Sequence, residues 1–100
     1  MMKPRGLVEL DDIELVFNAL AHAQRRQILV VLDARGGAMT SGEIAERFSC
    51  KWPTTSRHLR VLEAAGLVEV EQEGREWNYT LNRARLNRVA GHWINAFREE

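Results

Sequence analysis

Hydrophobic residues in the first third of the chain recur at the intervals of amphipathic helices. Apolar side chains at positions 13, 16, 17 and 20 fall on one helical stripe, and a second apolar group follows at positions 28, 29, 31 and 32. We predict that the first helix begins at Asp11 and Asp12, because carboxylates suit the positive end of a helix dipole. A second helix is predicted over residues 23–35. Residues 1–10, before the first helix, are expected to form a flexible N-terminus.

Two shorter helices are predicted over residues 41–48 and 52–65, with a break between them. Thr40 is followed three residues later by Glu43, which is the spacing of a capping box at a helix start. Pro53 falls in the first turn of the later helix, where its fixed φ angle and missing N–H are well tolerated. Both helices therefore carry their own start signals.

The hydrophobic period changes after these helices. Apolar and polar residues alternate over residues 68–71 and again over 77–81, which predicts two strands joined by a turn at 72–75. Trp77 and Tyr79 share one face of the second strand and are expected to face the core. Helical spacing returns over residues 83–98 with a continuous apolar stripe. The predicted fold is mainly α-helical with a small β-hairpin, in the order of four helices, two strands and a final helix.

Composition limits the class of protein. At 100 residues, with 45% hydrophobic and 28% charged positions, the chain is expected to form one globular domain over residues 11–98. No apolar run approaches the roughly 20 residues that span a bilayer, and no signal peptide is recognisable, so we expect a cytoplasmic protein without a membrane partner. Cys50 is the single cysteine, so an internal disulfide is excluded, as suits a reducing compartment.

Charge is balanced overall but segregated along the chain. Fourteen Lys and Arg residues oppose fourteen Asp and Glu residues, and a neutral total argues against a nucleic-acid partner. Residues 47–60, however, contain four basic residues and no acid, whereas residues 9–14 contain four acids and no base. Because a local patch sets the local field, residues 47–60 remain a candidate nucleic-acid surface.

The outer face of the predicted helix 52–65 is rich in small hydrogen-bond donors. A helix of about 10–12 Å diameter fits the ~12 Å major groove of B-DNA. Arg57 can bind guanine O6 and N7, and Lys51 can bind a DNA phosphate. The preceding helix, which begins at Ser41, would cross the sugar-phosphate backbone of the DNA. Whether Arg75 in the hairpin turn reaches the minor groove stays open, because glutamates surround it. The candidate DNA-binding residues are Ser41, Lys51, Thr54, Thr55, Ser56, Arg57, His58, Arg60 and Arg75.

The block from Pro53 to Val68 resembles the winged helix-turn-helix of the ArsR/SmtB family of bacterial repressors. It carries Ser-Arg-His-Leu at residues 56–59 and Ala-Gly-Leu-Val at 65–68, and the resemblance extends over about residues 12–97. It implies a homodimeric repressor that binds a palindromic operator of double-stranded DNA, with the first and last helices as the dimer interface. The interface residues expected on this basis are Ile13, Val16, Phe17, Leu86, Val89, Trp93, Ile94 and Phe97.

The chain departs from the metal sensors of that family. Those sensors carry Cys-x-Cys near the third helix or paired acid and His ligands on the last helix. Here residues 40–48 contain no cysteine, and His92 is the only histidine on the last helix. The C-terminal residues resemble instead the SdpR-like branch, which lacks metal ligands, so neither a metal nor another cofactor is expected. A metal- or thiol-responsive sensor of the same family stays an alternative, with Cys50 beside Lys51 as the candidate thiol switch.

Two other classes of function were weighed. An enzyme is not expected: the chain lacks a phosphate-binding Gly-rich loop and a nucleophile motif, and Ser56 and His58 stand at i, i+2, where side chains do not face each other. A winged-helix protein-interaction module without DNA binding is the second alternative. The neutral net charge favours it and the donor-rich face opposes it. The sequence identifies neither the operator nor an effector.

Overall fold

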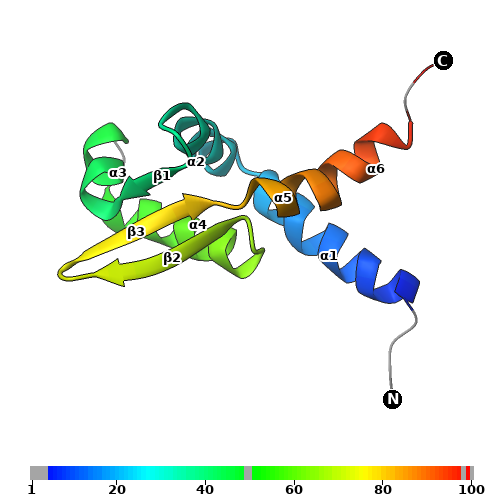
Figure 1. Ribbon diagram of the computed structural model, residues 1–100, viewed down its shortest axis with the longest axis horizontal. Coiled ribbons are helices and arrows are strands. Elements are labelled where there is room, and N and C mark those ends of the chain that lie inside the picture. Colours follow the sequence, from blue (N-terminus) through cyan, green and yellow to red (C-terminus); the bar gives the residue numbers. More distant parts are fainter. Residues whose placement is uncertain (1–4, 49–50, 98, 100) are drawn as a thin grey trace.

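The computed structural model describes residues 5–48, 51–97 and 99, and it places a small sheet and three helices on one side of the molecule (Figure 1). That side contains α2, α3, α4 and the sheet, whereas α1 and the last helical stretch lie together on the other side. The elements are α1 (Arg5–Leu20), α2 (Ala23–Ala34), β1 (Ala38–Thr40), α3 (Ser41–Arg47), α4 (Trp52–Ala64), β2 (Val68–Glu73), β3 (Glu76–Leu81), α5 (Arg83–Leu86), the π-helical turn η1 (Asn87–Gly91) and α6 (His92–Asn95).

The core lies where α1, α2 and α4 meet the sheet and the last helical stretch. Its side chains come from every one of these parts, because each amphipathic helix turns its apolar stripe inward. The fully buried side chains are mostly Leu, Ile, Val and Met, together with the methyl-bearing Thr55. The large side chains with less than 2% exposure are Leu32, Met39, Ile44, Leu59, Leu62, Leu67, Val16, Val68 and Thr55.

The predicted capping box at the start of α3 is present. The backbone N–H of Glu43 donates to Thr40 Oγ1 at 3.2 Å, and the backbone N–H of Thr40 donates to Glu43 Oε1 at 2.9 Å. These hydrogen bonds hold the pKa of the Glu43 carboxyl below its ordinary value. Arg35 adds an exposed ion pair to the same carboxylate at 3.2 Å. The box therefore fixes where α3 begins and ties it to the end of α2.

The predicted hairpin is present, but it belongs to a three-stranded sheet in the order β1-β3-β2. Both pairings are antiparallel, with Met39 opposite Tyr79 and Gln72 opposite Trp77. The hairpin turn is tighter than predicted, because Glu73 pairs with Glu76 and Gly74 takes a φ of 61°. The sequence did not reveal β1, since three residues after two glycines are too few to show alternation.

Three other predictions about the elements need correction. The first helix begins at Arg5 rather than Asp11, so part of the expected terminal segment belongs to α1. The last helix is not uniform, because the π-helical turn η1 separates α5 from α6. Trp77 is 45% exposed instead of buried, whereas Tyr79 does pack against the core. Trp77 is one pair away from the end of the hairpin, opposite Gln72. The tip of the hairpin extends beyond the helices (Figure 1).

Removing the capping hydroxyl should destabilise the fold. We expect Thr40→Ala to lose about 1 kcal/mol of unfolding free energy, because the Glu43 N–H loses its acceptor. Urea denaturation followed by circular dichroism measures this loss. Thr40→Ser keeps the hydroxyl and should stay near wild type. Equal urea midpoints for Thr40→Ala and wild type would contradict the role given to the box.

Candidate nucleic-acid interface

Helices α3 and α4 form the helix-turn-helix pair, and burial decides which face of α4 is available. Thr55, Leu59 and Leu62 are 2%, 1% and 0% exposed and stand at intervals of four and three, so they form one inward stripe. Thr55 was predicted to contact DNA, and that prediction does not fit its position. The face opposite this stripe is the only part of α4 that a ligand outside the protein can reach.

Basic and small polar side chains occupy the outward face. Lys51, Arg57 and Arg60 are exposed, while Thr54 and Ser56 are half-buried beside them. Lys51 is the N-cap residue and makes no side-chain capping bond. No acidic residue stands in the first turn of α4, so the positive end of the helix dipole is not neutralised there by the helix's own sequence. This face can bind phosphates and donate to base edges.

Ser41 lies at the start of α3 and Arg75 in the turn between β2 and β3. Ser41 begins α3, and its Oγ accepts a long hydrogen bond of 3.5 Å from the backbone N–H of Trp77. Arg75 is exposed in the hairpin turn, with exposed glutamates on both strands next to it. Cys50, the candidate thiol switch, lies outside the described residues.

His58 does not point freely outward. Its Nε2 lies 2.6 Å from Gln24 Oε1, and its Nδ1 lies 3.4 Å from Nη1 of Arg25. The His22 ring lies beside it, with ring centroids 5.7 Å apart. Burial and the positive charges of Arg25, His22 and Arg57 lower the pKa of His58 below its ordinary value of 6.5. The ring therefore connects α4 to the start of α2.

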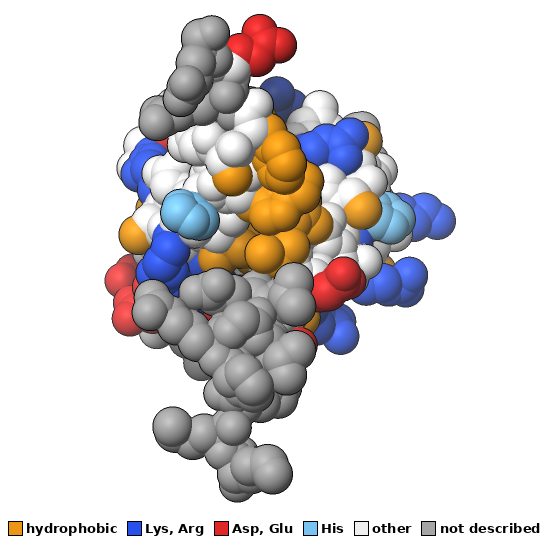
Figure 2. Space-filling view, turned by 90° about the vertical axis from the view of Figure 1, so that its right-hand side faces the viewer, with side chains coloured by type: hydrophobic (Ala, Val, Ile, Leu, Met, Phe, Trp, Pro, Cys, Tyr) orange, Lys and Arg blue, Asp and Glu red, His pale blue; other side chains and the backbone are white. Residues whose placement is uncertain are grey.

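A hydrophobic patch occupies the side of the molecule formed by α1 and the last helix (Figure 2). Trp93, Ile94 and Phe97 are 45%, 58% and 69% exposed. The Trp93 ring packs between Phe17 and Phe97, with centroid distances of 5.5 and 4.8 Å. Ile13, Phe17 and Leu86 are partly buried against the core.

Two residues of the expected dimer interface are inside the protomer. Val16 is completely buried and Val89 is 8% exposed, because each lies on the stripe that faces the chain's own core. In the single chain these two side chains serve the core, so they offer little surface to a partner. Trp93, Ile94 and Phe97 remain exposed next to Phe17, and a contiguous exposed apolar patch is typical of an interaction surface.

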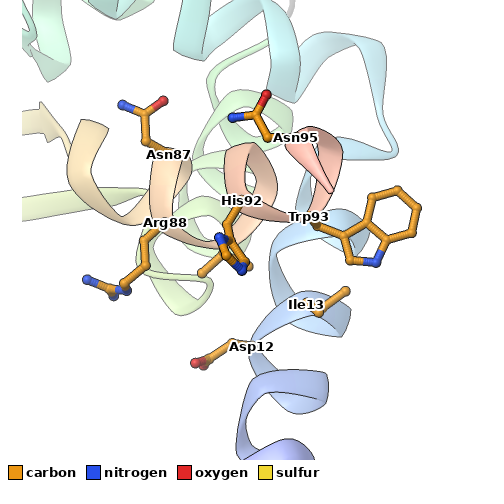
Figure 3. A pocket seen from close by; sticks show the side chains of 8 residues that line it. Asp12, Ile13, Asn87, Arg88, His92, Trp93 and Asn95 are labelled. Carbon is orange, nitrogen blue, oxygen red and sulfur yellow. The ribbon is translucent and has the colours of Figure 1, made fainter. Parts of the chain in front are cut away.

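A half-open pocket of about 610 Å³ lies between α1 and the last helical stretch (Figure 3). Arg88 and His92 project toward α1, where Asp12 and Ile13 lie, and Trp93 closes another side. Within the described part of the chain, no group of three or more His, Cys, Asp or Glu residues could hold a metal ion. No helix among the described residues is long and apolar enough to cross a membrane.

Arg85 joins this side of the molecule to the end of α4. Its Nε donates to the carbonyl oxygen of Ala65 at 2.7 Å, and its Nη2 donates to Asp12 Oδ1 at 3.1 Å. A side chain at Gly66 would place Cβ only 2.6 Å from Arg85 Nε, so the glycine leaves room for the guanidinium. One side chain therefore links α4, α1 and α5.

Comparison with known protein families and sequences gives a consistent result. Residues 20–71 match a family model described as a helix-turn-helix domain. The chain is 40% identical over 67 residues to the transcriptional repressor SdpR of Bacillus subtilis, which covers 67% of this chain and 72% of that protein. It is 36% identical over 64 residues to an HTH-type transcriptional regulator of Methanocaldococcus jannaschii, covering 64% and 70% of the two chains.

Solved structures with the same fold include ArsR-type regulators. The ArsR-like transcriptional regulator from Rhodococcus sp. RHA1 is 30% identical with a TM-score of 0.74, over 87% of this chain and 80% of that one. A homodimeric winged helix-turn-helix DNA-binding domain from Mycobacterium bovis, a possible ArsR-family regulator, is 29% identical with a TM-score of 0.74. That match covers 96% of this chain and 88% of the other.

Loss of the Arg85 guanidinium should destabilise the protein. We expect Arg85→Met to lose about 1–3 kcal/mol, because the Ala65 carbonyl and Asp12 lose a partner in a half-buried site. Arg83→Met is the matched control: its ion pair to Asp33 is exposed, so it should change stability by about 0.5 kcal/mol or less. Urea unfolding compares the two. Equal losses in both variants would show that Arg85 is an ordinary surface residue.

Proposed function

The chain belongs to the ArsR/SmtB family of winged helix-turn-helix regulators and is a DNA-binding transcriptional regulator; from that premise we propose that it is a homodimeric repressor that reads a palindromic operator with α4. Residues 11–98 would act as one DNA-binding domain. The observation that carries the proposal is the division of α4 into a buried stripe and an outward face of basic and small polar side chains.

The outward face of α4 suits the major groove. Arg57 is the candidate for a bidentate contact to guanine, worth about 1–3 kcal/mol of discrimination between bases. Thr54 and Ser56 are short enough to let the helix backbone approach the base edges, and Arg60 and Lys51 suit the flanking phosphates. Thr55 is excluded from the contact set because its side chain is buried.

The neighbouring elements would fix the register on the duplex. Ser41, at the start of α3, suits a phosphate of the strand that this helix crosses. Arg75, in the hairpin turn, is the candidate for a contact in the adjacent minor groove. The carboxylates on the two strands of the hairpin repel DNA phosphates, so we propose that only the hairpin turn reaches the DNA.

A second copy of the chain would cover the patch of Trp93, Ile94 and Phe97. Three exposed apolar side chains that continue from Phe17 are costly to leave in water, and burying them against the same patch of a partner gives a two-fold symmetric contact. Two copies of α4 would then meet successive major grooves, about 34–36 Å apart. The homodimeric domain from Mycobacterium bovis supports this assembly.

Two substitutions on the outward face should separate base reading from phosphate binding. On a site selected from random DNA, Arg57→Ala should weaken binding about 5- to 150-fold per protomer and reduce base preference. Lys51→Ala should weaken selected and unrelated DNA alike and make the salt dependence shallower. Arg88→Ala removes an exposed charge on η1, outside α4, and serves as the control. Fluorescence anisotropy over a salt series measures all three.

Failure of DNA binding has a clear signature in the same experiment. If the wild-type chain shows a flat salt response and no preference among duplexes, the repressor proposal is wrong. The interaction module without DNA binding would then be favoured.

A charge placed in the apolar patch should prevent dimer formation. Ile94→Asp should give a folded monomer, because an unpaired carboxylate cannot be buried cheaply in an apolar interface. Val30→Asp is the matched control, since Val30 is 67% exposed on α2 and outside the patch. Sedimentation velocity gives the mass and circular dichroism checks the fold. A dimer that survives Ile94→Asp would place the interface elsewhere.

A further inference from the structure

We infer that Arg25 and His58 are positioning residues that hold α4 in its DNA-reading orientation while His58 is neutral, and that protonation of His58 releases this contact. The functional part of this inference rests on the proposed DNA-binding role of α4. The structural part, a contact that opens when one ring gains a proton, can be tested without DNA.

Arg25 is a fixed anchor. It is 7% exposed, although it carries a permanent charge. Its Nε donates to the carbonyl oxygen of Ala19 at 2.7 Å, and its Nη2 donates to the carbonyl oxygen of Asn18 at 3.0 Å. Both carbonyls belong to the last turn of α1. The Ala19 carbonyl is buried, so the guanidinium cannot move away without leaving this acceptor unpaired. The Asn18 carbonyl also accepts from the backbone N–H of Ala21 at 3.2 Å, so its bond to Arg25 is a second, additional hold on the guanidinium.

The partners of the His58 ring define its hydrogen positions. Gln24 Oε1 lies 2.6 Å from Nε2 and is an acceptor, so Nε2 carries the hydrogen. Nδ1 therefore keeps its lone pair, which faces Nη1 of Arg25 at 3.4 Å. In this neutral tautomer both ring nitrogens have a complementary partner on α2. The ring thereby sets how α4 sits against the junction of α1 and α2.

A second proton would reverse the contact with Arg25. It can add only at Nδ1, where it would convert an acceptor into a donor that faces a guanidinium. The charged or titratable groups around the ring are Arg25 on α2, His22 just before α2 and Arg57 on α4 itself, and each of them carries or can gain a positive charge. Since Arg25 is anchored, the imidazolium has to move, and α4 moves with it.

Displacement of His58 affects the residues proposed to read DNA. Arg57 is its neighbour in the chain and Arg60 follows within one helical turn, so a rotation of α4 misaligns both. An added positive charge near DNA also attracts phosphate, which acts in the opposite direction. The ring nitrogens face α2 rather than the outward face, so we expect the loss of alignment to outweigh this attraction.

The first experiment follows the histidine rings by NMR in the full chain without DNA, from pH 7.5 to pH 5. We expect His58 to titrate below its ordinary pKa of 6.5 and the backbone amides near Gln24 and Arg57 to follow the same curve. The exposed His92 is the internal control, and its titration should leave these amides unchanged. A His58 pKa at or above 6.5, or amides near Arg57 that ignore its titration, would overturn the inference.

The second experiment measures DNA affinity over the same pH range on a selected site. Wild-type affinity should fall by up to about tenfold per pH unit per protomer once the pH is below the pKa of His58. Relative to its own affinity at pH 7.5, His58→Gln should lose this dependence, because an amide can accept from Arg25 and carries no charge. His92→Gln should keep the wild-type profile.

Two outcomes of the second experiment overturn the inference: an affinity that rises on acidification, and a pH profile that His58→Gln leaves unchanged. Absence of DNA binding at pH 7.5 is a different result. It would contradict the proposed function, whereas the NMR titration would still decide whether the contact opens on protonation.

Discussion

Burial of one stripe of α4 is the constraint on which the arrangement of the molecule depends. Thr55, Leu59 and Leu62 enter the core, so the rotation of the helix about its axis is fixed. The residues between them in sequence, among them Arg57 and Arg60, then have to face outward. In a domain of 100 residues the surface that can recognise a ligand is thus determined by the same hydrophobic effect that folds the chain.

Two arginines secure this packing, one at the middle of α4 and one just after its last residue. Arg25 contacts the carbonyls at the end of α1 and reaches His58, while Arg85 contacts Ala65 just after α4. Both donate to backbone carbonyls at a helix end, where intrahelical donors run out. A guanidinium suits this role, because its several N–H donors have a fixed geometry and can hydrogen-bond to two structural elements at once. Apolar side chains provide packing between elements but no such directional bonds. Both arginines also connect α4 to α1, which contributes to the apolar patch.

Much of the fold could be predicted from local sequence signals, and the errors have physical causes. The capping box at Thr40 and Glu43 depends on neighbouring residues alone, so it was predicted and is present. Strand β1 depends on pairing with β3, far along the chain, and no local period reveals it. The start of α1 was also misjudged, because Asp11 was taken as a start signal although the helix extends through it.

For the candidate site, residue types were predictable but the direction of side chains was less so. Thr55 has the polarity expected of a DNA contact, yet its place in the 55, 59, 62 stripe buries it, a signal that was available in the spacing. Val16 and Val89 likewise lie on stripes that serve the protomer's own core. The contact between His58 and Arg25 joins residues 33 positions apart and could not be read from the sequence.

The hairpin is part of a three-stranded sheet at one end and has only two strands at the other, so its two ends differ in stiffness. Strand β1 pairs with β3 from Asn78 to Thr80, so this part is three strands wide and anchored through the buried Met39. Beyond Asn78 only β2 and β3 continue toward Arg75. Two-stranded ribbons twist more readily than wider sheets. The hairpin thus has a stiff base and a pliable end, and it can follow the curvature of a neighbouring surface without disturbing the core.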